Sequence, residues 1–287
     1  MRKSYFNWVF LLLLLVGGCG VTEVPGPMPD DEFLVIAHRG ASAYLPENTL
    51  EAFSLAEKLD APYIELDIHL TKDGKMVVMH DEDVSSTTEA SGEIASFTLS
   101  ELKQLSADAR QSETIAVSDQ EDSFAVPTLE EVFNQFGDQM NYVVELKDPE
   151  QYPGIEEKLV ALLKQYELMG FDKKERPKAV VQSFSEKGLK RVHELEPAIP
   201  LLQLISFEDD EEAKLSDKEV EDLLKYAAGI GISYEALTPP FVNEMHKQGL
   251  TVYAYTVNKK EDALKMKSMR VNGIHTDHPD LLKNSGK

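Results

Sequence analysis

The chain has 287 residues, enough for one large α/β barrel or for two ordinary domains. Hydrophobic residues make up 42% and charged residues 28% of it, as in a globular protein with a sizeable core. The 51 acidic and 29 basic residues leave a formal charge of −22, which argues against nucleic acid partners and against broad docking onto anionic lipid. An anionic substrate would therefore need a local basic patch or a bound metal ion.

The start of the chain has the features of a targeting signal. Arg2 and Lys3 precede an apolar stretch at positions 8–16 that is too short to span a bilayer. The following Val16-Gly17-Gly18-Cys19 resembles the bacterial lipoprotein signal, which predicts a signal peptide over residues 1–18 and lipid attachment at Cys19. An ordinary secretory signal with an incidental cysteine is the alternative. We expect an extracytoplasmic protein that an N-terminal lipid holds to a bacterial membrane.

Residues 19–32 are expected to form a tether, because Pro and Gly are frequent there, and residues 33–287 the folded domain. In that domain short apolar runs alternate with helical patterns, which is typical of β/α units around a parallel sheet. Helices are predicted between eight strands, and Asn48, Thr128 and Asn258 each precede a glutamate at the spacing of a capping box. The pattern predicts a (β/α)₈ TIM barrel with its chemistry at the carboxyl ends of the strands. The predicted strands are 33–37, 63–67, 142–147, 179–182, 201–204, 229–233, 252–256 and 273–276.

Two segments interrupt the alternation. The run Thr71-Lys72-Asp73-Gly74 has the composition of a tight turn, so residues 76–80 are expected to return antiparallel to an extension of the second strand. The hairpin would bring His80 back over the site. Residues 82–126 are polar and rich in Ser and Thr, which predicts an insertion on the same rim, either a lid or a small satellite subdomain.

Acidic side chains gather at the ends of two predicted neighbouring strands. Glu65 and Asp67 are two residues apart, so both project to the same side of a strand that apolar residues surround. Glu145 and Lys147 repeat this spacing on the next strand. Buried carboxylates repel one another unless a positive charge lies between them, and oxygen-only ligation suits Ca²⁺ or Mg²⁺. Glu65, Asp67 and Glu145 are therefore predicted to hold one divalent cation; surface acids and a plain Glu145–Lys147 salt bridge are the alternatives.

Two histidines lie at strand ends beside these acids. His38 closes the first strand and His80 the returning arm of the hairpin, and an imidazole can serve as base or acid near neutral pH. Arg39 offers a planar donor fork to phosphate oxygens, and Lys147 adds a point charge. The remaining histidines are interpreted as structural or surface residues, with His275 nearest the rim. They are His69, His193, His246, His275 and His278.

The motifs resemble those of the glycerophosphodiester phosphodiesterases, in order, from about Val35 to Leu282. They are His38-Arg39-Gly40, Pro46-Glu47-Asn48-Thr49, Ile64-Glu65-Leu66-Asp67, Leu70-Thr71-Lys72-Asp73-Gly74, Val77-Val78-Met79-His80-Asp81-Glu82, Pro127-Thr128-Leu129, Glu145-Leu146-Lys147, Gln182-Ser183-Phe184, Tyr255-Thr256-Val257-Asn258 and Gly273-Ile274-His275-Thr276-Asp277.

The resemblance implies a metal-dependent TIM barrel that hydrolyses small glycerophosphodiesters to an alcohol and glycerol 3-phosphate. His38 and His80 would be the acid and base, Glu65, Asp67 and Glu145 would hold the metal, and Arg39 and Lys147 would bind phosphate. Phe184 is expected to pack on the carbon face of the glycerol, unless it only ends a core strand.

The sequence departs from the family's usual pattern at three places. Ser85-Ser86-Thr87-Thr88 lacks an arginine that often follows the His-Asp pair, Tyr255 stands where tryptophan is usual, and Arg270 stands where glycine is common. These departures leave the core chemistry intact and concern substrate preference and the rim.

Two other functions remain open from the sequence. One is a phospholipase D-like enzyme acting on lysophospholipids or sphingolipids, which would need an apolar rim facing a membrane. The polar, acidic loops favour small soluble diesters or fragments of wall polymers. The other is a lipid-anchored protein that captures phosphorylated solutes without turning them over, although binding alone needs no acid–base pair.

Overall fold

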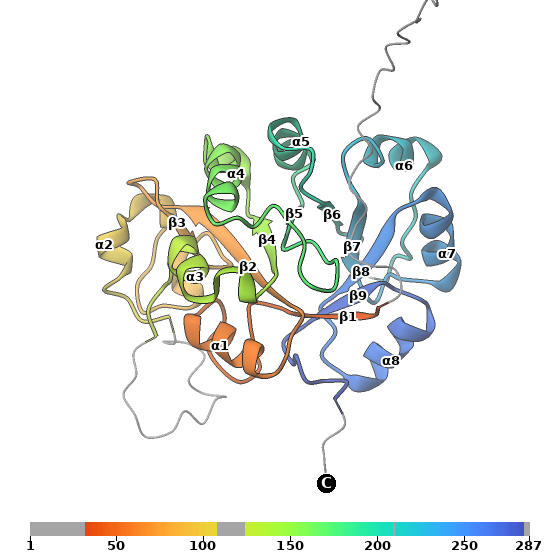
Figure 1. Cartoon of the computed structure of the whole chain (residues 1–287), viewed down its shortest axis with the longest axis horizontal. Helices are drawn as coiled ribbons and strands as arrows, with labels where there is room; N and C mark the ends of the chain where they lie inside the picture. Colours follow the sequence, from red (N-terminus) through yellow and green to blue (C-terminus); the bar gives the residue numbers. More distant parts are fainter. Residues whose placement is uncertain (1–31, 108–123, 209, 284–287) are drawn as a thin grey trace, which may run out of the picture.

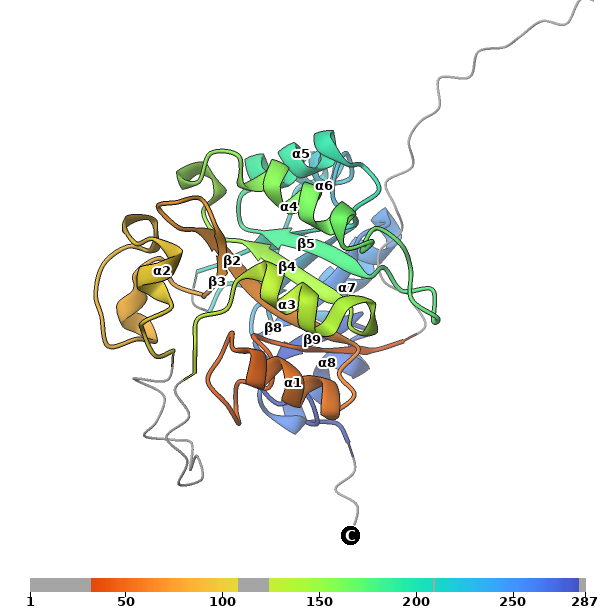
Figure 2. The ribbon, with the colours of Figure 1, turned by 60° about the vertical axis from the view of Figure 1, so that its left-hand side comes forward.

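The computed structural model describes residues 32–107, 124–208 and 210–283. Within this part nine strands form one sheet, in the order β1-β9-β8-β7-β6-β5-β4-β2-β3. Strand β1 pairs in parallel with both β2 and β9, so all strands except β3 close into a parallel barrel (Figures 1 and 2). This is the predicted (β/α)₈ barrel. The strands are β1 Leu34–Ala37, β2 Tyr63–Leu70, β3 Met76–Val78, β4 Tyr142–Leu146, β5 Ala179–Ser183, β6 Leu201–Ile205, β7 Gly229–Ser233, β8 Thr251–Tyr255 and β9 Gly273–Thr276.

Helices surround the barrel at the positions that the hydrophobic periodicity predicts (Figure 1). Helix α3 begins at Leu129, directly after Thr128, whose side chain and Glu131 form the predicted capping box. The capping predictions for Asn48 and Asn258 were wrong: Thr49 caps α1, and α8 follows Lys259 without a side-chain cap. The helices are α1 Leu50–Lys58, α2 Leu99–Leu102, α3 Leu129–Phe136, α4 Ile155–Gln165, α5 Glu186–Leu195, α6 Asp217–Leu223, α7 Pro239–Gln248 and α8 Lys260–Ser268.

Side chains alternate between the inside and the outside of the barrel. Outward residues of the strands pack with the helices into the main core, and a second buried cluster fills the lower interior. Tyr63 and Val143 belong to this interior cluster, so the strand period of two places Glu65 and Asp67, and likewise Glu145, inside the barrel and nearer the carboxyl ends of the strands. The interior cluster is Leu34, Ile36, Tyr63, Val143, Val180, Leu202 and Tyr253.

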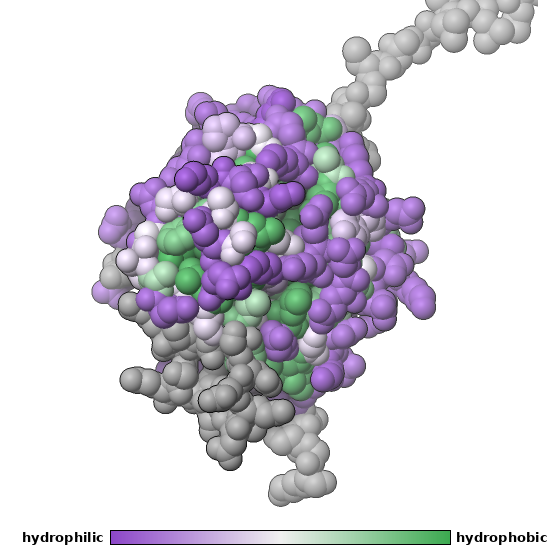
Figure 3. All heavy atoms as spheres, turned by 90° about the vertical axis from the view of Figure 1, so that its left-hand side faces the viewer, coloured by the Kyte–Doolittle hydropathy of each residue, from purple (hydrophilic) through white to green (hydrophobic). Residues whose placement is uncertain are grey.

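The hairpin and the described residues of the insertion form a lobe beside β2. Strand β3 pairs antiparallel with the end of β2, as predicted. The described residues of the insertion and β3 pack around an apolar cluster of their own. This packing favours the satellite subdomain rather than the lid as the interpretation of the insertion. Residues 108–123 lie outside the described part. Figure 3 shows this face of the molecule, where hydrophilic side chains cover most of the surface and smaller apolar areas lie between them. The cluster is Val77, Met79, Val84, Ile94, Leu102, Ala107, Phe124 and Val126.

The backbone at Arg270 shows why glycine is common at this position in the family. Its φ is 67°, in the left-handed region that glycine adopts most easily. The turn after α8 therefore favours the glycine that is common at this position, and the chain accepts an arginine there at some cost in backbone strain.

Candidate active site

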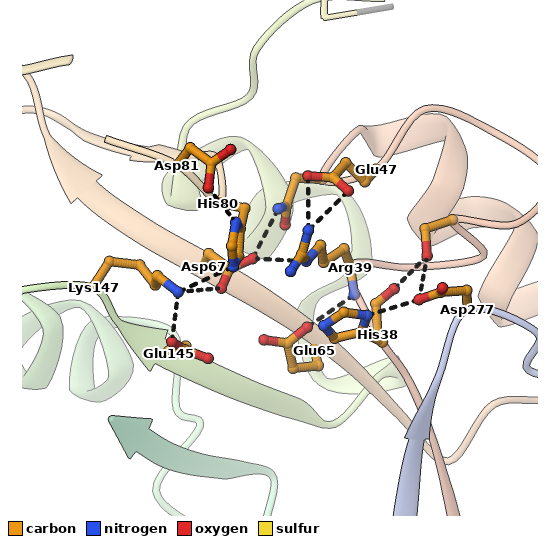
Figure 4. Close-up of polar contacts among 12 residues, drawn as sticks. His38, Arg39, Glu47, Glu65, Asp67, His80, Asp81, Glu145, Lys147 and Asp277 are labelled. Carbon is orange, nitrogen blue, oxygen red and sulfur yellow. Dashed lines mark hydrogen bonds and ion pairs between the residues drawn. The ribbon is translucent and has the colours of Figure 1, made fainter. Parts of the chain in front are cut away.

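Three carboxylates from two adjacent strands meet inside the upper end of the barrel (Figure 4). Asp67 of β2 lies directly opposite Glu145 of β4 in the parallel register, and Glu65 lies two residues earlier. Glu65, Asp67 and Glu145 expose 0%, 1% and 7% of their surface, and each offers an oxygen within 4.8 Å of the others. Such close packing of buried acids matches the predicted ligand set for a hard divalent cation.

The proximity of these carboxylates shifts their ionisation. Burial, together with Asp67 and Glu145, raises the pKa of Glu65 well above its usual value. Burial and Asp67 also raise the pKa of Glu145. For Asp67, burial is outweighed by the charges of Arg39 and Lys147, and its pKa is lowered. The protein's own cations therefore neutralise the cluster only in part, which leaves it suited to a further positive charge.

Arg39 is held beside the carboxylates by an uncommon backbone conformation. Its φ is 56°, and its backbone N–H donates to Glu65 Oε2 at 2.9 Å. Its Nη1 donates to both carboxylate oxygens of Glu47, at 3.1 and 2.9 Å, and its Nε lies 3.6 Å from Asp67 Oδ2. The next residue must be glycine, because a Cβ on Gly40 would lie 2.8 Å from the backbone of Ala52.

Asn48 is a site residue that sequence reasoning took for a helix cap. It also has a left-handed backbone, with φ 57°, and its Nδ2 donates to Asp67 Oδ2 at 2.9 Å. Only 3% of Asn48 is exposed. The amide therefore orients one of the three carboxylates, and the Pro46-Glu47-Asn48-Thr49 motif contacts the site through Glu47 and Asn48.

Lys147 connects the carboxylates to His80. Its Nζ lies 2.8 Å from Glu145 Oε1, 3.9 Å from Asp67 Oδ1 and 3.2 Å from His80 Nε2. The other ring nitrogen of His80, Nδ1, lies 2.6 Å from Asp81 Oδ1, and burial lowers the pKa of His80. The hairpin thus brings His80 over the carboxylates, as predicted. His69 is structural, since its Nε2 holds the backbone oxygen of His80 at 3.1 Å.

His38 is oriented by Asp277, a residue to which the sequence analysis gave no role. His38 Nδ1 lies 2.7 Å from Asp277 Oδ1, which Ser42 Oγ also contacts at 3.1 Å. Asn258 Nδ2 donates to Asp277 Oδ2 at 2.5 Å. Asp277 lies just beyond β9, and Asn258 lies just beyond β8. Each is the last residue of one of the family-like motifs. These motifs were therefore the signal in the sequence that could have identified both residues.

A cavity of about 190 Å³ joins these groups. In its wall, Gln182 links two of the carboxylates, because its Nε2 donates to Glu65 Oε1 at 3.3 Å and to Glu145 Oε2 at 3.1 Å. Phe184 exposes 48% of its surface and packs edge-on against Tyr255. It therefore lies where its ring can contact a substrate in the cavity, rather than only ending a core strand. The cavity is lined by His38, Arg39, His80, Glu145, Lys147, Gln182, Phe184, Leu204, Tyr255, Thr256 and His275.

Comparison with known proteins decides the family. The model of the glycerophosphoryl diester phosphodiesterase family matches residues 38–281. The chain belongs to this family. A glycerophosphodiester phosphodiesterase of Bacillus subtilis is 39% identical to it over 98% of this chain and 97% of the relative. A glycerophosphodiester phosphodiesterase of Caldanaerobacter subterraneus is 37% identical over 88% of this chain and 96% of the relative.

Solved structures agree with this assignment. An Oleispira antarctica phosphodiesterase in complex with the product sn-glycerol-3-phosphate superposes with a TM-score of 0.68 at 29% identity, covering 88% of this chain and 94% of that one. A Thermotoga maritima glycerophosphodiester phosphodiesterase superposes with a TM-score of 0.65 at 28% identity, covering 87% and 96%. This chain is therefore an enzyme that hydrolyses glycerophosphodiesters. No helix among its described residues is long and apolar enough to cross a membrane.

Tyr255 shows how this glycerophosphodiester phosphodiesterase accommodates another departure from the family's pattern. The tyrosine replaces the usual tryptophan, and its hydroxyl donates to the backbone oxygen of Ile205 at 3.0 Å. The ring still lines the cavity and packs on Phe184. The substitution thus preserves an aromatic wall and fixes it to β6.

Proposed function

We propose that this enzyme cleaves glycerophosphodiesters with one divalent cation and with His38 and His80 as an acid–base pair, releasing an alcohol and glycerol 3-phosphate. The observation that carries the proposal is that both imidazoles line one cavity together with Glu145, which belongs to the buried carboxylate cluster. Acid–base catalysis needs a proton acceptor and a proton donor within reach of the same phosphate.

The donor set of the cluster fits a hard cation. Glu65, Asp67 and Glu145 would hold it, with Ca²⁺ and Mg²⁺ the ions that oxygen-only ligands favour. The bound ion would supply Lewis-acid polarisation of the phosphate or of the attacking hydroxyl. Asn48 and Gln182 orient the ligands through their hydrogen bonds to Asp67, Glu65 and Glu145.

The chain's own residues supply the rest of the chemistry. Arg39 and Lys147 offer positive charge to the phosphate from two sides of the cavity. His38 uses Nδ1 on Asp277, which leaves Nε2 for proton exchange. His80 uses Nδ1 on Asp81, and its Nε2, which contacts Lys147 Nζ at 3.2 Å, becomes available for proton exchange when Lys147 turns to the phosphate. One imidazole takes the proton of the attacking oxygen, either of water or of a glycerol hydroxyl, and the other protonates the departing alkoxide. If the glycerol hydroxyl attacks, a cyclic phosphate forms first, and water then opens it to glycerol 3-phosphate.

The surface around the cavity favours small soluble diesters or wall-polymer fragments over membrane lipids. Among the described residues, the large hydrophobic side chains with an exposed surface are Tyr44, Phe171, Phe184 and Leu264, and of these only Phe184 lines the cavity. An enzyme that draws lysophospholipid from a bilayer would need a broader apolar rim.

Product identity tests the proposed reaction. The full chain should release glycerol 3-phosphate and choline from glycerophosphocholine, because the leaving group is the alcohol and the phosphate stays on the glycerol. Phosphorus NMR of the reaction separates this product from phosphocholine. Release of phosphocholine, or tight binding of the diester without any product, would refute the proposed reaction.

We also propose that the enzyme works outside the cytoplasm, held to a bacterial membrane by a lipid on Cys19. The signal-like residues 1–18, Cys19 and most of the tether lie outside the described residues, so the sequence motif alone supports this proposal. Cys19→Ala should move the protein from the membrane fraction to the soluble fraction while leaving its activity intact, as immunoblots of fractionated cells would show. A variant that still sediments with membranes would contradict lipid attachment.

A further inference from the structure

His275 is a third imidazole in the active-site cavity, and the mechanism above does not use it. It lies on β9 and lines the same cavity as His38 and His80. Only 2% of its surface is exposed, and its ring packs edge-on against the ring of His38 with centroids 6.5 Å apart. Within the described part of the chain its Nε2 is buried without any hydrogen-bond partner.

An unpaired polar atom in this position is costly unless a ligand pairs with it. Most buried side-chain polar atoms in proteins have a partner, and an exception calls for a specific reason such as a role in catalysis or binding. Burial and the charge of His38 lower the pKa of His275 to about 3, so its ring is neutral and offers one donor and one acceptor. A neutral ring adds no charge for the phosphate, which Arg39 and Lys147 already face.

The ligand that suits a neutral imidazole is an uncharged hydroxyl. A glycerophosphodiester carries two free hydroxyls on its glycerol half, and a hydroxyl can both donate to and accept from a ring nitrogen. We propose that His275 hydrogen-bonds a free hydroxyl of the glycerol half and so selects glycerol diesters over diesters that lack this hydroxyl. This inference rests on the proposed function and adds a specificity-determining residue to it.

The test compares three choline diesters on the full chain. Glycerophosphocholine is measured beside the phosphocholine esters of propane-1,2-diol and propane-1,3-diol, each of which lacks one hydroxyl. Wild type should prefer glycerophosphocholine over at least one analogue by roughly 10–100-fold in kcat/KM, the range expected when a buried polar group loses its partner. His275→Phe should lose most of this preference by losing activity on glycerophosphocholine alone. His275→Gln, which keeps a donor and an acceptor, should restore part of it.

Binding of the phosphate products provides a readout without turnover. Calorimetry should show that wild type binds glycerol 3-phosphate more tightly than the matching propanediol phosphate, and that His275→Phe binds the two alike. Two results would overturn the role of His275 while leaving the proposed reaction in place. One is an equal loss of kcat/KM on all three diesters in both variants. The other is a wild type that shows no preference among the diesters. A wild type that hydrolyses none of the diesters but still distinguishes the phosphates would refute the proposed reaction and support His275.

Discussion

His38→Ala and His80→Ala should each lower kcat for glycerophosphocholine by about 10²–10⁴-fold, the usual contribution of a positioned general acid or base. In free energy this is about 2.7–5.4 kcal/mol of the activation barrier. KM should change little, because Arg39, Lys147 and the cation that the carboxylates would hold, rather than the two imidazoles, bind the phosphate. Steady-state kinetics at saturating Ca²⁺ or Mg²⁺ measures both parameters.

A histidine outside the site serves as the matched control. His193 lies on α5 and does not line the cavity, so His193→Gln should keep wild-type kcat. Full activity in either His38→Ala or His80→Ala would remove that histidine from the acid–base pair. A loss confined to KM would do the same, because that pattern describes a binding residue rather than a proton donor or acceptor.

Glu65→Gln should weaken binding of the divalent cation on the order of 100-fold and reduce turnover accordingly, because it removes one charge from a set of three ligands. Isothermal titration of the EDTA-treated protein with Ca²⁺ measures the affinity. Glu221→Gln, on the exposed surface of α6, is the matched control and should titrate as wild type does. Unchanged affinity in Glu65→Gln would remove Glu65 from the ligand set.

The same substitution should stabilise the metal-free protein at pH 7. Burial and the neighbouring carboxylates raise the pKa of Glu65 in the folded state. An acid whose pKa is higher in the folded than in the unfolded state destabilises the fold at any pH above its unfolded value, so its removal should raise Tm. Added Ca²⁺ should then raise Tm less in Glu65→Gln than in wild type. A lower Tm without metal would show that Glu65 serves the fold through its contacts with Arg39 and Gln182.

The parts of the fold that sequence reasoning predicted are those that local periodicity determines. The strand period of two placed Glu65 and Asp67 on one side, and the turn at Asp73-Gly74 indicated the hairpin that returns His80 to the site. Each inference needed only neighbouring residues and the rule that the carboxyl ends of parallel strands share one face of a barrel.

The parts that the sequence did not reveal depend on loops that meet only in three dimensions. Asn48 has the spacing of a helix cap, yet its left-handed backbone turns the amide onto Asp67, and Thr49 takes the cap instead. Asp277 reaches His38 across 239 positions of sequence because β9 closes the barrel against β1. Spacing along the chain carries no information about such contacts, since ring closure creates them.

The most direct test of the account is anomalous diffraction from crystals of the full chain grown with Mn²⁺ and glycerol 3-phosphate. The difference map should show one cation bound by oxygens of Glu65, Asp67 and Glu145, with the phosphate beside it between His38 and His80. A cation bound elsewhere would contradict the proposed metal site. A phosphate bound in the cavity, with Glu145 still paired to Lys147 and no ion among the carboxylates, would contradict it as well.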